Sequence, residues 1–143
     1  MSGRTFQFPL DPVLQLRTRA VDDAREALAR AVRARTEAEA ALASAETALA
    51  AHGSQAAVRV TAWDLGGVAA RHVVGVRAAG AARRVLDRCR SSETRARRAL
   101  AETVRAHEAV ATLRTEAAEA HRAERARVEG AALDDLAVLR HAA

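Results

Sequence analysis

Hydrophobic positions recur every seven residues through the first third of the chain. The first row of such positions consists of Leu14, Val21, Leu28, Arg35, Leu42 and Leu49. A second row lies three residues further on and consists of Ala24, Ala31, Ala38 and Ala45. A seven-residue repeat kept over this length is typical of a helix that packs lengthwise against another long helix. The pattern predicts a helix from residue 11 to about residue 51, starting at Asp11 and Pro12, which both favour a helix start.

A weaker pattern with the same period follows in the second half. No proline or glycine interrupts residues 81–129, which predicts a second helix. Its stripe consists of Ala96, Thr103, Val110 and Ala117 together with Ala99, Ala106, Leu113 and Ala120. Gly130 is expected to end this helix before a short helix or turn over residues 131–140. Two such helices fold back most simply as an antiparallel pair, which would place the two ends of the chain side by side.

The segment between the two stripes loses the seven-residue repeat. His52, Gly53 and Ser54 are expected to end the first helix, and four glycines follow before residue 81. We therefore predict an irregular connector over residues 52–80. Within it, one face of a short, broken helix is indicated by the spacing of Trp63, Leu65, Val68, His72 and Val76.

Composition agrees with a helical coiled coil and argues against a sheet. The chain of 143 residues has only two Phe, one Trp and no Tyr, so it lacks the large side chains that usually fill a globular core. Alanine, arginine, glutamate and leucine dominate instead. The expected fold is all-α: a single elongated antiparallel two-helix coiled coil, or helical hairpin, over residues 1–143.

Charge is concentrated in one stretch. All 23 basic residues are Arg, and the net charge of +5 is accounted for between Arg83 and Arg98. This stretch is either a surface for an acidic or phosphate-bearing partner or a solvated helix face with pairs such as Glu93 and Arg97.

Residues suited to catalysis or to cofactor binding are not arranged for either task. The five histidines do not fall at metal-ligand spacing, and no phosphate-binding loop follows Gly66 and Gly67. The lone Cys89 has no general base placed beside it and excludes an internal disulfide. We expect no enzyme activity, no cofactor, no metal and no bound nucleotide. Without an apolar leader or a membrane span, a cytoplasmic protein is expected.

Two end segments carry a resemblance to a known family. The opening, with Phe6-Gln7-Phe8-Pro9-Leu10, Val13-Leu14 and Leu16-Arg17 before a long charged helix, resembles that of the flagellar export protein FliJ family. The closing segment, with Glu124-Arg125, Glu129, Leu133-Asp134-Asp135-Leu136-Ala137 and Arg140, is similar to the end of that family's sequences.

The resemblance implies a stalk-like coiled coil of the flagellar type III export apparatus. Such a protein would bind the hexameric export ATPase, promote its assembly and activity, and link it to the export gate at the cytoplasmic face of the membrane; it would also handle export chaperones. We expect the ATPase end to consist of Phe6, Phe8, Leu10, Leu14, Arg17, Leu133, Asp134, Asp135 and Leu136. We expect the gate end to consist of Trp63, Leu65 and Val68.

Each of these groups also has a purely structural interpretation. Phe6 and Phe8 would cap the open end of the hairpin, Asp134 and Asp135 would cap a last short helix, and Trp63 would be a packing anchor. Two other functions also remain open: a generic coiled-coil scaffold, and a nucleic-acid binder acting through the basic stretch.

Arg35 is the exception in the first row, because a guanidinium at a seam position lowers stability unless it reaches water or a carboxylate. On this basis, replacing Arg35 with leucine is expected to raise the melting temperature.

Overall fold

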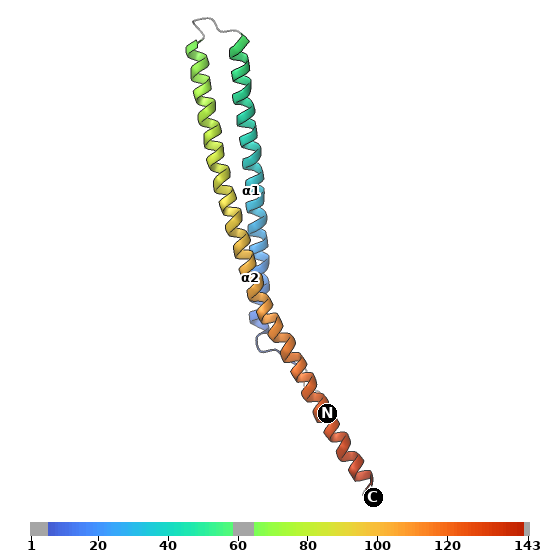
Figure 1. The fold of residues 1–143 in the computed structure, drawn as a ribbon. Coiled ribbons are helices and arrows are strands. Elements are labelled where there is room, and N and C mark those ends of the chain that lie inside the picture. Colours follow the sequence, from blue (N-terminus) through green and yellow to red (C-terminus); the bar gives the residue numbers. More distant parts are fainter. Residues whose placement is uncertain (1–5, 59–64, 142–143) are drawn as a thin grey trace. The chain divides into compact units, whose positions relative to one another are not determined.

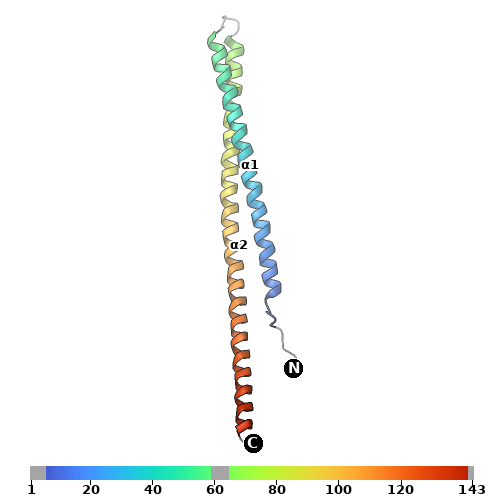
Figure 2. The same ribbon diagram turned by 90° about the vertical axis from the view of Figure 1, so that its right-hand side faces the viewer.

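Two α-helices make up the part of the chain that the computed structural model describes, residues 6–58 and 65–141. Helix α1 spans Asp11–Val58 and helix α2 spans Leu65–His141. The described residues contain no strand. Where α1 and α2 pair, they run in opposite directions (Figures 1 and 2). The prediction of an all-α antiparallel helical hairpin is therefore confirmed.

The chain divides into two compact units. Asp23–Ala101 forms the connector unit, and Met1–Asp22 together with Glu102–Ala143 forms the terminal unit. Each unit contains a segment of α1 and a segment of α2, so each has its own helix pairing. The expected single domain over residues 1–143 stays a prediction.

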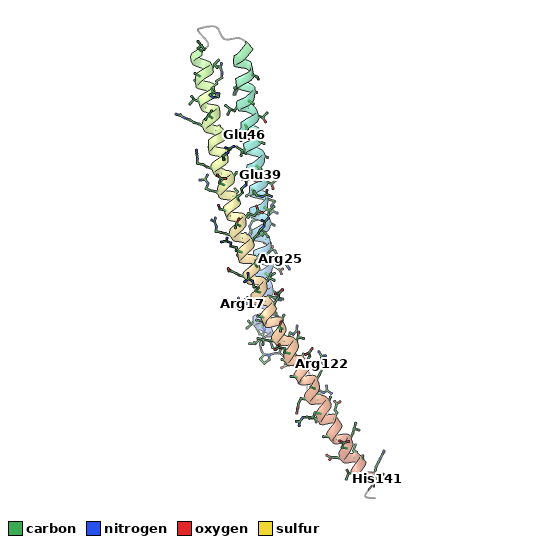
Figure 3. All side chains as sticks on the ribbon, viewed as in Figure 1. Arg17, Arg25, Glu39, Glu46, Arg122 and His141 are labelled. Carbon is green, nitrogen blue, oxygen red and sulfur yellow. The ribbon has the colours of Figure 1, made fainter. Side chains whose placement is uncertain are left out.

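Ion pairs between the helices define the register of the connector unit. Glu46 of α1 pairs with Arg83 of α2 at 2.9 Å, and Glu39 lies 3.5 Å from Arg90. The residue number therefore falls along α1 as it rises along α2, which is the register of an antiparallel pair. Figure 3 shows Glu39 and Glu46 on α1 where it borders α2.

The predicted seam of α1 is confirmed by burial. Every residue of its two rows, from Leu14 to Leu49, is buried or half-buried. The most covered are Val21 and Ala38, each with 6% of its surface exposed. Short alanine side chains allow the two backbones to approach closely, so little apolar area is needed to close the seam.

The seam of α2 is half as predicted. Ala96, Thr103, Val110 and Ala117 are half-buried, which confirms the first row. In the second row only Ala106 is half-buried, and the prediction is wrong for Ala99, Leu113 and Ala120, which are exposed. Its place is taken by a row on the other side of the first, which contains Leu86, Glu93, Leu100 and His107. This row was not predicted because two of its members, Glu93 and His107, are polar, whereas alanines occur on every face of the helix.

Both helices extend beyond their predicted limits near the connector. Helix α1 continues through His52, Gly53 and Ser54 to Val58, and α2 begins at Leu65 rather than near residue 81. Glycine in a helix interior lowers stability by only ~1 kcal/mol relative to alanine, and pairing with the second helix can offset this. The prediction of an irregular connector over residues 52–80 is therefore wrong for residues 52–58 and 65–80, which are helical. Trp63 lies outside the described residues.

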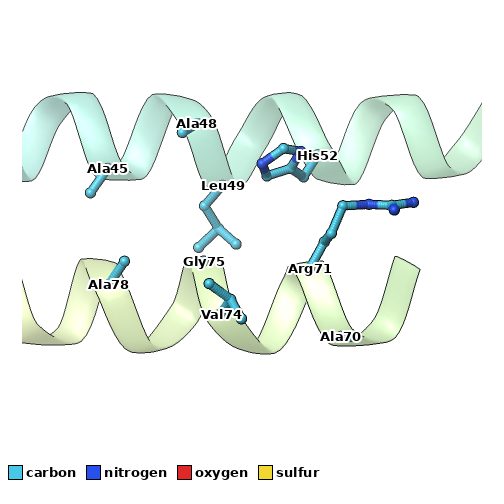
Figure 4. Close-up of a pocket in the computed structure, with 9 residues that line it drawn as sticks. All are labelled: Ala45, Ala48, Leu49, His52, Ala70, Arg71, Val74, Gly75 and Ala78. Carbon is cyan, nitrogen blue, oxygen red and sulfur yellow. The ribbon is translucent and has the colours of Figure 1, made fainter. Parts of the chain in front are cut away.

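Gly75 has a packing role inside the connector unit. A Cβ atom at this position would lie 2.9 Å from Cδ1 of Leu49, closer than real Cβ contacts come. The missing side chain lets Leu49 of α1 lie directly against the backbone of α2, as Figure 4 shows. A residue expected to break the helix therefore allows the two helices to meet.

Gly130 does not end α2. The helix continues through it to His141, and no glycine of the described chain has a positive φ. A helix-ending glycine of the usual kind adopts the left-handed conformation, which is absent here. The predicted short helix over residues 131–140 is instead the last part of α2.

Candidate functional site

The N-terminal segment of the terminal unit packs against α2. Phe8 is buried, with 8% of its surface exposed, and the ring centroid of Phe6 lies 5.5 Å from that of His121. Asp11 Oδ1 lies 3.3 Å from Arg114 Nε. These contacts agree with the structural interpretation, in which the two phenylalanines cover the end of the helix pairing.

The backbone around this segment starts α1. The amide of Asp11 donates to the carbonyl of Phe8 at 3.1 Å, and the amide of Leu14 donates to the carbonyl of Leu10 at 2.9 Å. Leu10 retains 40% of its surface exposed and Arg17 is exposed, while Leu14 is half-buried in the seam. Leu10 and Arg17 are therefore accessible to a partner.

The four C-terminal site residues lie on the exposed last part of α2. Leu133 and Leu136 keep 66% and 58% of their surfaces exposed, and Asp134 and Asp135 are exposed as well. Because the two aspartates lie inside a continuous helix, the interpretation that they cap a helix start is wrong. A shallow groove on one face of this segment is lined by Leu133, Leu136, Ala137, Arg140 and His141.

The structure does not bring the two halves of the predicted ATPase end together. Phe6 lies beside His121, and Leu133 follows His121 by twelve residues, a rise of about 18 Å along a helix. The expectation that the two ends lie side by side is wrong, because α2 runs on past Gly130 without turning back.

The described members of the predicted gate end, Leu65 and Val68, lie at the start of α2 in the connector unit. Leu65 is the first residue of the helix and keeps 57% of its surface exposed, whereas Val68 is half-buried in the seam. Only Leu65 is thus freely accessible among the described members of this group.

Sequence reasoning did not count further exposed apolar groups of the same helix among the site residues. Val73, Val74 and Val76 keep 47%, 65% and 48% of their surfaces exposed. Val74 also lines a groove of about 400 Å³ between the helices (Figure 4). The other residues that line this groove are Ala45, Ala48, Leu49, His52, Ala70, Arg71, Gly75 and Ala78. The seven-residue row through Val68 and Gly75 is the signal that would have placed this segment in a helix.

A charged network crosses the seam of the connector unit. Arg35 Nε lies 2.7 Å from Glu93 Oε2, and Arg35 Nη1 donates to both carboxylate oxygens of Glu39 at 2.9 Å. Glu93 has only 5% of its surface exposed and pairs also with Arg97. The contact between Arg35 Nε and Glu93 is an ion pair whose geometry does not meet that of a hydrogen bond. The seam arginine therefore neutralises a buried carboxylate of the other helix.

No metal or membrane site is found in the part of the chain described. Residues 6–58 and 65–141 contain no group of three or more His, Cys, Asp or Glu side chains placed to hold a metal ion. Cys89 is half-buried in the α2 seam. Neither helix, over its described residues, has an apolar stretch long enough to cross a membrane.

Comparison with known proteins identifies a family. The family described as Flagellar FliJ protein matches residues 6–143, nearly the whole chain. Searches among curated proteins and among solved structures found no match. A match of this length includes both end segments that carry the resemblance and the helices between them. The chain therefore belongs to the flagellar FliJ protein family.

Proposed function

We propose that this protein is a non-enzymatic, stalk-like component of the flagellar type III export apparatus that binds the export ATPase ring and promotes its assembly and activity. In this proposal it also links the ring to the export gate and handles export chaperones. Membership of the FliJ family supports a role in flagellar export in general.

The observation that carries the ATPase assignment is the exposed apolar surface at the end of α2. Leu133 and Leu136 project from a helix whose residues 122–129 and 131–138 are all exposed. Exposed leucines at a spacing of three residues lie on one helix face and fit an apolar groove of a partner. Leaving such groups in water is unfavourable, which argues for a partner that covers them.

The first experiment is the ATP hydrolysis rate of the flagellar export ATPase from the same organism, at low enzyme concentration, with and without an equal amount of this protein. Stimulation is expected, and it should fade as the ATPase becomes concentrated enough to assemble alone. No change in rate together with no co-elution would refute the proposal.

Paired variants test the site itself. Leu133→Asp/Leu136→Asp should abolish stimulation while leaving helicity intact, because both side chains are exposed in the free protein. Val73→Asp/Val76→Asp is the matched control, since it places the same charges at the same spacing on exposed positions of the same helix. Equal loss of stimulation in both variants would contradict the assignment.

The gate end is tested separately. Leu65→Asp should weaken binding to the cytoplasmic domain of the export gate in a pull-down, while stimulation of the ATPase is retained. Gate binding equal to that of the unchanged protein would remove Leu65 from the proposed contact.

A further inference from the structure

A row of arginines lies on the face of α2 that points away from the seam in the connector unit. The seam of this segment is formed by Leu86 and Glu93 at heptad position a, and by Ala82, Cys89 and Ala96 at position d. Positions c and f then lie on the opposite face. They are occupied by the residues that we call the outer arginine stripe: Arg77, Arg84, Arg88, Arg95 and Arg98.

Within the described part of the chain, these five arginines differ from their neighbours in having no ion-pair partner. Arg83, Arg90 and Arg97, at position e beside the seam, pair with Glu46, Glu39 and Glu93. Among the described residues, none of the five stripe arginines forms an ion pair with a carboxylate, and all five are exposed. This face therefore carries five guanidinium groups that no carboxylate of the described residues neutralises.

The stripe is long and free of carboxylates at its own positions. From Arg77 to Arg98 it spans 22 residues, or about 31 Å of helix. The remaining c and f positions within this range are Ala81 and Ser91, and Asp87 borders the stripe without pairing with any of its arginines. Stripe arginines one heptad apart lie about 10 Å from each other, close to the screening length of physiological salt, so their fields add over the whole face.

We propose that the outer arginine stripe binds an anionic lipid surface. Guanidinium groups form paired hydrogen bonds with phosphates, and a basic segment gains affinity for each arginine held near a negatively charged membrane. A flat surface can meet all five groups of such a row at once. The stripe contains no aromatic side chain on which a nucleic-acid base could stack and no Asn or Gln to read a base edge.

The test is flotation of the purified full chain with vesicles at low salt. Binding is expected to vesicles that contain phosphatidylglycerol and phosphatidylcholine, and it should be lost at high salt. Binding to phosphatidylcholine alone at the same level, or no binding to either composition, would overturn the proposal.

Two variants with the same loss of charge separate the stripe from net charge. Arg84→Gln/Arg88→Gln/Arg95→Gln/Arg98→Gln should lower vesicle binding by roughly fivefold for each arginine lost. The control replaces with glutamine four exposed arginines outside the stripe, Arg19, Arg33, Arg71 and Arg122. It should retain most of the binding, and circular dichroism should show equal helicity for both. Equal loss in the two variants would refute the stripe.

Two further readouts distinguish this surface from other partners. Duplex DNA that binds the chain and displaces it fully from the vesicles at equal phosphate concentration would refute the lipid assignment. The stripe variant should still stimulate the export ATPase, because the stripe lies outside the proposed ATPase end. This inference therefore stands or falls separately from the proposed function.

Discussion

Polar side chains at the seam decide how the two helices of the connector unit are matched. Arg35 occupies a position where the repeat calls for leucine, and it lies against Glu93, which is nearly covered on α2. A buried carboxylate without a cation would be very unfavourable, whereas a buried pair is close to neutral in stability. Only one alignment of the helices brings these two side chains together. The pair therefore selects the register that small alanines specify poorly.

Replacing Arg35 alone should destabilise the protein, which reverses the expectation from the sequence. Arg35→Leu leaves Glu93 buried with Arg97 as its remaining cation. The unfavourable free energy of this less neutralised buried carboxylate outweighs the favourable apolar contact that leucine adds. We expect the free energy of unfolding, measured by urea denaturation, to fall by less than the roughly 3–5 kcal/mol of a fully unpaired buried charge, because Arg97 still pairs with Glu93.

The double variant Arg35→Leu/Glu93→Leu provides the control. It removes both charges and should be at least as stable as the unchanged protein, since apolar replacement of a buried pair is often neutral or favourable. A single variant more stable than the unchanged protein would show that Glu93 does not need Arg35.

The pKa of Glu124 is expected to lie below the ordinary glutamate value. The hydrogen bond from Arg127 lowers the pKa of Glu124, because it favours the ionised carboxylate. The stabilisation that the ionised Glu124 gains from Arg127 is present at a pH above the ordinary glutamate pKa. It is lost as the pH falls through the lowered pKa of Glu124 in the folded protein. Carboxyl chemical shifts measured by NMR should show this, and Arg127→Gln should raise the midpoint. An unchanged midpoint in the variant would exclude the hydrogen bond as the cause.

Helix continuity depends on where each glycine lies relative to the other helix. A Cβ atom added at Gly53 or Gly130 would meet no neighbouring atom within 4 Å. These two glycines therefore adopt the helical conformation without being required by packing. Gly75 faces Leu49 at a distance that a side chain would not permit. The same residue type thus has two roles, and the sequence does not distinguish them without the partner helix.

Alanine substitutions should separate the two roles within the connector unit. Gly53→Ala should stabilise this unit by up to ~1 kcal/mol, because alanine favours a helix and meets no neighbour. Gly75→Ala should gain clearly less, because Leu49 must leave its rotamer. Thermal unfolding followed by circular dichroism gives the comparison. A loss of stability in Gly53→Ala would instead mark a helix end at the position predicted from the sequence.

The terminal unit contains a long stretch of helix with little cover. Residues 102–121 of α2 include most of the half-buried positions of this unit, whereas residues 122–129 and 131–138 are exposed throughout. A helical segment of this length is marginally stable in water without a packing partner. Its order in the cell would therefore depend on what it binds.

Hydrogen exchange should reveal this difference. Amides of residues 122–141 are expected to exchange faster than those near Leu86 and Glu93, where the seam is most covered. Adding the export ATPase should slow exchange in residues 122–141 if this segment is the ATPase end. Protection confined to residues 65–76 would place the ATPase contact at the other predicted site.

Local pattern was sufficient to predict the helical class, the start of α1 at Asp11 and its seam from Leu14 to Leu49. These features depend on a regular repeat and on capping chemistry, both of which act within a few turns of chain. The two end segments were likewise sufficient to predict the family, because their residue patterns are specific to it.

Contacts between the helices decided the remaining features. The seam of α2 is fixed by charge pairing with α1, and Gly75 lies in the helix where Leu49 of α1 packs against its backbone. Helix α2 also continues past Gly130. The helix that runs on separates Leu133 from Phe6, so the predicted ATPase end is two surfaces rather than one. Such features follow from which residues meet across the seam, and a single helix's own sequence does not contain that information.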